Sequence, residues 1–104
     1  MENKLIRDLE LGFIRIHILH HTAKEPVYGS EFRAELKRHG YDIAFGTLYP
    51  IFHRLEKNGY ISSKKENVNG KIRKYYSITE EGHAILKQAK VKANELVAEL
   101  NEDD

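Results

Sequence analysis

The sequence of 104 residues contains no cysteine and no tryptophan, and only two prolines. Without cysteine, disulfides and thiolate metal sites are excluded, and no redox chemistry is implied. Long apolar runs are also missing, because charged residues interrupt the N-terminal stretch before it reaches the ~20 apolar residues of a membrane helix. A chain of this length forms one small domain without a large enclosed cleft. We therefore expect a cytoplasmic protein with neither a signal peptide nor a membrane helix.

The patterns of catalytic sites are missing as well. The sequence has no Gly-rich phosphate loop, no nucleophile paired with a base and no complete set of metal ligands. His17, His20 and His21 are spaced so that two imidazoles could meet one metal ion, but no cysteine or acidic cluster stands beside them in the sequence. A structural role near a helix C-terminus is the stronger interpretation, and metal binding stays open. We expect no enzyme, no catalytic residue and no cofactor.

Charge is distributed unevenly along the chain. Residues 1–45 carry seven Lys or Arg and seven Asp or Glu, residues 46–79 carry seven and two, and residues 80–104 carry three and seven. The net charges of the three segments are therefore 0, +5 and −4. A basic middle beside an acidic tail indicates one surface that faces a polyanion and a separate element that faces away from it.

Apolar spacing predicts a mainly α fold with a small β-hairpin. A first helix is expected over about residues 3–21 and a second over about residues 28–39, with Gly40 suited to end it. The first helix has apolar side chains on two faces, and a small domain can cover only one of them. The face with Ile14 and Ile18 is therefore expected to pack against another element or another chain.

A third helix is expected in the stretch GTLYPIFHRLEKNGYI, residues 46–61. Leu48, Phe52 and Leu55 recur at helical spacing and form an apolar face, which leaves a basic face outward. Pro50 is compatible with a helix that begins at its Gly-Thr start, because the N–H groups of a first turn have no intrahelical acceptors to lose.

Two strands are expected next, over residues 60–68 and 71–78. The Asn69-Gly70 pair between them is a strong hairpin signal, because both residues tolerate positive φ. The turn sets a register that pairs Val68 with Lys71, Asn67 with Ile72, Lys65 with Lys74, Ser63 with Tyr76 and Ile61 with Ile78. The base of this hairpin is apolar, and its tip projects the cations Lys64, Lys65, Lys71, Arg73 and Lys74.

A last helix is expected to follow Thr79, a good N-cap. It has a coiled-coil-like seam of about two heptads, formed by Leu86, Ala89, Ala93, Leu96 and Leu100. Together with Ile14 and Ile18 of the first helix, this seam is the expected dimer interface. The expected organisation is a winged helix-turn-helix over residues 1–79 and a C-terminal dimerisation helix over residues 80–104, forming one compact unit.

Two longer motifs in the sequence are similar to those of a known protein family. The stretch GTLYPIFHRLEKNGYI and the run RKYYSITEEG, residues 73–82, together resemble the PadR family of bacterial transcriptional regulators, and VYGSEF, residues 27–32, is similar to the start of that family's second helix. The single C-terminal helix is similar to the short branch of the family. The resemblance covers essentially the whole chain.

The resemblance implies a DNA-binding regulator, usually a repressor, that reads a palindromic operator as a homodimer with its third helix in the major groove. The expected DNA contacts on the helices and the hairpin are Tyr28, Thr47, Tyr49, Pro50, His53, Arg54, Lys57, Lys64, Lys65, Lys71, Arg73 and Lys74. Any small-molecule effector is expected at the dimer interface, where it would change the spacing of the two third helices. The alternative is a winged helix that binds another protein, which would not need the basic hairpin.

Overall fold

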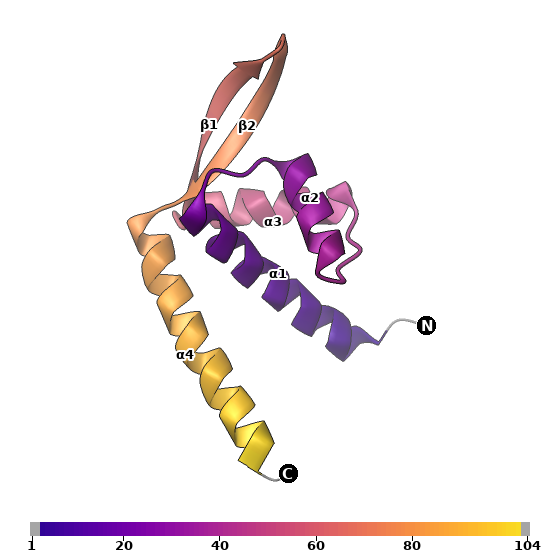
Figure 1. Cartoon of the computed structure of the whole chain (residues 1–104), viewed down its shortest axis with the longest axis vertical. Coiled ribbons are helices and arrows are strands. Elements are labelled where there is room, and N and C mark those ends of the chain that lie inside the picture. The colour runs from indigo at the N-terminus through magenta and orange to yellow at the C-terminus, as the bar shows by residue number, and fades with distance from the viewer. Residues whose placement is uncertain (1–2, 103–104) are drawn as a thin grey trace.

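The computed structural model describes residues 3–102 of the chain. The elements follow in the order α1 (Lys4–Lys24), α2 (Gly29–Arg38), α3 (Phe45–Lys57), β1 (Ile61–Val68), β2 (Lys71–Ile78) and α4 (Glu80–Glu102). The first three helices form a body from which the hairpin projects, and α4 leaves the root of the hairpin and runs away from the body (Figure 1). Three helices followed by a two-stranded hairpin form a winged helix, as predicted. None of the helices within residues 3–102 is long and apolar enough to span a membrane.

The core lies between α1, α2, α3 and the base of the hairpin. The apolar face predicted for α3 is confirmed, because Leu48, Phe52 and Leu55 are all buried, and Ile51 joins them. Phe52 stacks on Tyr76 of β2 with ring centroids 4.6 Å apart, so the hairpin is fixed to α3 through the core. The other buried apolar residues are Ile14, Ile18, Leu19, Val27, Phe32, Leu36, Ile43, Ile61 and Leu86.

Helix α3 begins earlier than predicted. It starts at Phe45, with Ala44 as an N-cap that makes no side-chain hydrogen bond, so Pro50 lies in the second turn rather than the first. Proline has no N–H to donate to the carbonyl oxygen of Gly46, which loses its normal intrahelical partner. Gly46 is exposed, so this end of the helix remains in contact with solvent. Pro50 is itself exposed, so it lies on the outward face of α3.

The predicted hairpin register is confirmed at every pair, from Val68 opposite Lys71 at the tip to Ile61 opposite Ile78 at the base. Asn69 and Gly70 have φ values of 53° and 83°, which is the left-handed conformation that this two-residue turn requires. The turn is stabilised further because the Gly70 N–H donates to the side-chain oxygen of Asn67 at 2.9 Å.

Thr79 joins the root of the hairpin to α4. Its hydroxyl accepts a hydrogen bond from the N–H of Gly82 at 3.0 Å, which confirms the predicted N-cap, and donates to the carbonyl oxygen of Gly59 at 2.6 Å. Gly82 packs so closely that a Cβ there would collide with the carbonyl oxygen of Tyr60 and lie 2.7 Å from Cγ1 of Ile78. The run TEEG is therefore a tight junction between the end of α3, the hairpin and α4.

The apolar face of α1 that was assigned to a partner chain lies in the core instead. Ile14 and Ile18 are 1% and 0% exposed, so the prediction that they form a dimer surface is wrong. They pack inside the protomer because α1 turns this face toward α2 and α3. The exposed apolar stripe of α1 is formed by Leu5, Leu9 and Phe13, of which Leu5 is 75% exposed.

The seam predicted on α4 divides between the core and the solvent. Leu86 is buried against the body, so its assignment to a dimer interface is also wrong. Ala89 is half-buried, and Ala93 is exposed. Leu96 and Leu100 are 50% and 61% exposed, so the distal part of the helix carries apolar side chains that no other described element covers. Of the tail predicted as part of this helix, residues 103–104 lie outside the described range.

Candidate nucleic-acid interface

The outward face of α3 carries the side chains expected from its helical spacing. Tyr49, Pro50, His53, Arg54 and Lys57 are all exposed, and Thr47 is half-buried. The rings of Tyr49 and His53 lie 6.0 Å apart along one side of this face. None of these positions carries an acidic side chain, so this exposed helix face is suited to the groove of a polyanion such as a nucleic acid.

One flank of that face lies beside α1. Thr47, Pro50 and Arg54 line a shallow cavity of about 190 Å³ together with Leu11 and Arg15 of α1. Arg54 thus lies on the side of α3 that borders α1, and Arg15 adds a second arginine to the same cavity. Arg15 was not predicted from the sequence, because a single arginine on a mixed-charge helix gives no local signal of which element it will face.

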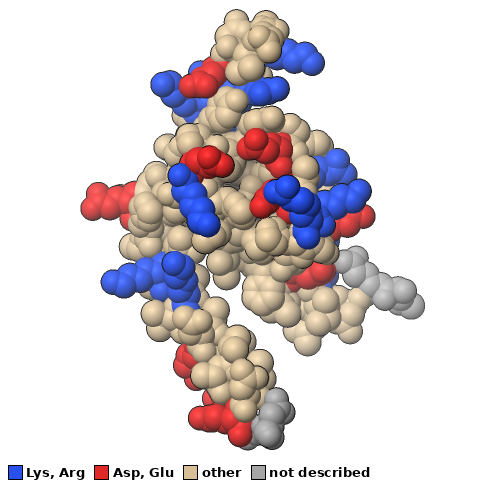
Figure 2. Space-filling model, viewed as in Figure 1, with Lys and Arg blue, Asp and Glu red and all other residues tan. Residues whose placement is uncertain are grey.

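The hairpin distributes its cations over two faces. The observed register puts Lys65 and Lys74 on the face of Tyr76, whereas Lys64, Lys71 and Arg73 lie on the other face. Lys64, Lys65 and Lys71 are exposed, and Lys and Arg side chains gather along the hairpin in Figure 2, while Asp and Glu side chains gather toward the far end of α4. The separation of charge predicted from the sequence is therefore present on the surface.

Lys74 differs from the other cations, because it does not project freely as predicted. Its Nζ lies 3.3 Å from Oε1 of Glu56 in α3 and 5.4 Å from the centre of the Tyr76 ring. The hydroxyl of Ser63 in β1 donates to the other oxygen of Glu56. The hydrogen bond from Ser63, followed by the nearby Lys74, lowers the pKa of Glu56. Lys74 and Glu56 thus connect the hairpin to α3.

Arg73 is held on the opposite face of the hairpin. Its guanidinium lies 4.5 Å above the ring of Tyr28, and that ring meets Tyr75 edge-on at 5.4 Å. The stack orders a long cationic side chain beside the start of α2, which reduces the conformational entropy that it would lose on binding an anion. Tyr28 therefore supports a cation at this site.

A cavity of about 230 Å³ lies where the start of α2, α3 and β2 meet. The start of α2 has no side-chain cap, so its first N–H groups point outward without a side-chain acceptor. Tyr76 is 2% exposed, and this burial raises its pKa. The cavity is lined by Tyr28, Gly29, Ser30, Phe45, Tyr49, Ile72, Arg73, Lys74 and Tyr76.

This combination of an exposed third helix and a basic hairpin also has known relatives. Residues 18–88 match the family described as "Transcriptional regulator PadR-like family". The chain belongs to this family. The resemblance found in the motifs is therefore confirmed, and this PadR-like chain is a transcriptional regulator rather than an enzyme.

Individual relatives agree with the family assignment. The PadR-like chain is 40% identical to the transcriptional regulator Rv3488 of Mycobacterium tuberculosis over 95 residues, which cover 91% of this chain and 89% of the relative. It is 32% identical to a PadR family transcriptional regulator from Eggerthella lenta, with a TM-score of 0.83 over 94% of this chain and 87% of the other. A PadR-like transcriptional regulator from Bacillus cereus gives a TM-score of 0.83 at 29% identity, covering 91% and 94%.

Proposed function

We propose that this PadR-like regulator is a repressor that binds a palindromic operator as a homodimer. The observation that carries the proposal is that cations from other elements flank the exposed face of α3 on both sides. Arg15 joins Arg54 on the α1 side, and Arg73 lies over Tyr28 on the hairpin side. A helix flanked in this way can enter a major groove while its neighbours meet the two phosphate backbones.

The side chains divide by role on DNA. His53, Arg54 and Lys57 project from the helix, where side chains reach base edges in a major groove about 12 Å wide. Arg54 is the reader of guanine in this proposal, since a bidentate arginine is the commonest specific contact. Thr47, Tyr49 and Pro50 shape the entry of the helix. Lys64, Lys65 and Lys71 follow the backbone or a minor groove.

The cavity between α2, α3 and β2 is the proposed position of one backbone phosphate. Helix N-termini attract anions through their free N–H groups and the helix dipole. Tyr28 and Arg73 stand at the same cavity, so an aromatic side chain and a guanidinium lie beside this helix start. Lys74 contributes here only as a structural partner of Glu56, which is a narrower role than the sequence suggested.

Dimerisation is proposed through apolar side chains of α1 and α4 that the protomer leaves exposed. On α1 these are Leu5, Leu9 and Phe13, and on the α4 seam they are Ala93, Leu96 and Leu100, with the half-buried Ala89 at its edge. A two-fold dimer places its third helices on half-sites about 34 Å apart, which makes the operator palindromic. An effector at this interface would release DNA by changing that spacing. Such a regulator acts in the cytoplasm, where bacterial DNA is found.

The experiment separates base reading from backbone contact. An operator is first selected from random duplexes by the wild-type protein, and binding of selected and scrambled duplexes is then measured by fluorescence anisotropy across a salt series. Arg54→Ala should cost about 1–3 kcal/mol on the operator and little on scrambled DNA. Lys71→Ala should weaken both and lower the salt slope by about one per lost phosphate contact, or about two for the dimer.

Lys87→Ala is the matched control, because Lys87 is an exposed lysine of α4 on an element that faces away from the hairpin. Its binding should equal that of the wild type on both duplexes. Equal losses for Arg54→Ala on operator and scrambled DNA would exclude base reading at this position. Binding that does not depend on salt would exclude the nucleic-acid function.

A further inference from the structure

Three histidines meet between α1 and the C-terminal end of α2. His17 and His21 come from successive turns of α1, and His39 is the C-cap of α2. One ring nitrogen from each of the three lies within 4.8 Å of the other two. The rings of His17 and His39 are only 4.9 Å apart. The cluster is therefore a convergent set of nitrogen ligands.

A carboxylate completes the cluster. Oε1 of Glu35 lies 3.5 Å from Nε2 of His39 and 3.9 Å from Nε2 of His21. Its second oxygen pairs with Arg38, which fixes the orientation of the group. Glu35 is only partly exposed, with 21% of its side chain accessible. Three imidazoles form a known zinc ligand set, and a carboxylate that pairs with a ligating imidazole commonly orients it.

The sequence pattern pointed to a different trio, with His20 in place of His39. In the structure His20 meets His21 edge-on at 5.3 Å, but it is not part of the convergent set. The positive groups that act on its pKa are Lys24 and Lys90, so it faces α4 rather than α2. In the structure His39 takes the place expected for His20. Glu35 also joins the cluster, and it is the acidic partner that is missing near His17 in the sequence.

We propose that His17, His21 and His39, with Glu35 as fourth ligand or orienting partner, bind one divalent transition-metal ion of the class that prefers imidazole. Zn²⁺, Ni²⁺ and Cu²⁺ belong to this class. A tetrahedral ion with nitrogen ligands at about 2.0–2.1 Å places those nitrogens roughly 3.4 Å apart. The ligand nitrogens of the three histidines lie within 4.8 Å of one another, so binding an ion requires the rings to move closer together.

The surroundings of the cluster suit such an ion. Burial, then the charges of His39, His21 and His20, lower the pKa of His17. Burial, then the charges of His20, His39, Lys24 and Arg38, lower the pKa of His21. Imidazoles must be neutral to bind a metal, and these are held neutral near pH 7.

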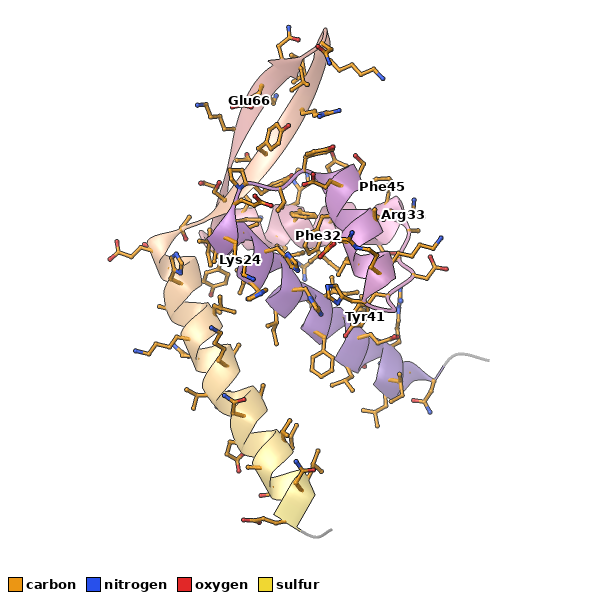
Figure 3. All side chains as sticks on the ribbon, in the orientation of Figure 1. Lys24, Phe32, Arg33, Tyr41, Phe45 and Glu66 are labelled. Carbon is orange, nitrogen blue, oxygen red and sulfur yellow. The ribbon has the colours of Figure 1, made fainter. Side chains whose placement is uncertain are left out.

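Two aromatic rings restrict the movement of the ligands. Tyr41 meets His17 edge-on at 5.4 Å, and Phe32 meets His21 edge-on at 5.5 Å. Figure 3 labels both, Phe32 between α1 and α2 and Tyr41 just after α2. Because the rings are already positioned, binding an ion costs little conformational entropy. An ion there would join the middle of α1 to the C-terminal end of α2.

The test is isothermal titration calorimetry of the tag-free protein with ZnCl₂, after removal of metals with a chelator. The wild type should bind one Zn²⁺ per chain in the micromolar range or tighter. His39→Ala and His17→Ala should each weaken binding at least tenfold. His83→Ala is the matched control, because His83 is exposed on α4 outside the cluster, and it should bind as the wild type does. Titration with CoCl₂ should give the visible absorption of a tetrahedral site in the wild type only.

Folding does not obscure the result. The side chain of His39 is 44% exposed, so circular dichroism of His39→Ala should match that of the wild type. Zn²⁺ should raise the melting temperature of the wild type more than that of His39→Ala at the same concentration, because the stabilisation grows with the affinity of the folded state for the ion. The proposal is overturned if the wild type does not saturate at one ion per chain, if His39→Ala binds equally well, or if His83→Ala loses binding. None of these measurements depends on DNA.

Discussion

Nζ of Lys74 in the second strand of the hairpin lies 3.3 Å from the carboxylate of Glu56 in the third helix. The same carboxylate accepts a hydrogen bond from Ser63 in the first strand. One side chain of α3 is thus bound to both strands, at the place where the hairpin leaves the body. Glu56 therefore connects both strands of the hairpin to α3.

Replacing Glu56 by glutamine should destabilise the protein at neutral pH but not in acid. Because the folded state holds the pKa of Glu56 below its ordinary value of about 4.3, its contribution is present above that pH and is lost as the pH falls through the folded pKa. The expected difference at pH 7 is about 1 kcal/mol. Urea unfolding at pH 7 and pH 3 measures it. Glu95→Gln, on the exposed part of α4, should show no such difference, and a pH-independent loss for Glu56→Gln would contradict the ionic account.

Gly82→Ala should destabilise the chain by about 1–3 kcal/mol, because the new methyl group would overlap the carbonyl oxygen of Tyr60. Gly46→Ala is the contrasting substitution, since no atom lies within 4 Å of a Cβ at that position. Alanine there should leave stability unchanged or raise it by up to about 1 kcal/mol. Thermal unfolding of both variants decides the matter, and similar melting temperatures would show that α4 can shift to accept the methyl group.

Leu96→Lys should weaken self-association without unfolding the protomer, because Leu96 is 50% exposed on the distal part of α4. A lysine there would place a charge in the proposed dimer seam. Asn94→Lys adds the same charge to the same helix on a different side and should leave association unchanged. Sedimentation equilibrium at micromolar concentration measures all three proteins. A monomeric wild type would refute the dimer, and equal effects of both lysines would place the interface elsewhere.

The histidine cluster should make the metal-free protein sensitive to acid. The folded state lowers the pKa of His17 and His21 below the ordinary value of about 6.5, so the unfolded chain binds more protons between the two values. Stability should therefore be complete above about pH 6.5 and should decrease as the pH falls below it. Melting temperatures from pH 8 to pH 5, recorded with a chelator, test this. His17→Gln should flatten the dependence while His83→Ala keeps it, and an unchanged slope for His17→Gln would contradict the account.

Features set by neighbouring residues could be predicted from the sequence. The Asn69-Gly70 turn determines the hairpin register, because a two-residue turn with positive φ at both positions pairs the residues on either side of it. Thr79 was recognisable as an N-cap, and the apolar face of α3 followed from its spacing. In each case the interaction that decides the structure lies within one element or one turn.

Features set by contacts between elements could not be predicted. The two apolar faces of α1 are similar in composition, and only packing against α2 and α3 decided that Ile14 is buried while its neighbour Phe13 is exposed. The ion pair between Lys74 and Glu56 depends on the angle of the hairpin. His39 joins His17 only because α2 ends beside α1. No local spacing contains this information.

The tight junction at Thr79 and Gly82 holds the N-terminal end of α4 at the root of the hairpin, and the rest of the helix extends away from that point. Its 23 residues extend about 34 Å, so a rotation of about 10° at the junction displaces the far end by roughly 6 Å. The same hydroxyl of Thr79 donates to the carbonyl oxygen of Gly59, just after the end of α3. A small rotation of α4 at this junction therefore produces a large displacement of its C-terminal end relative to α3.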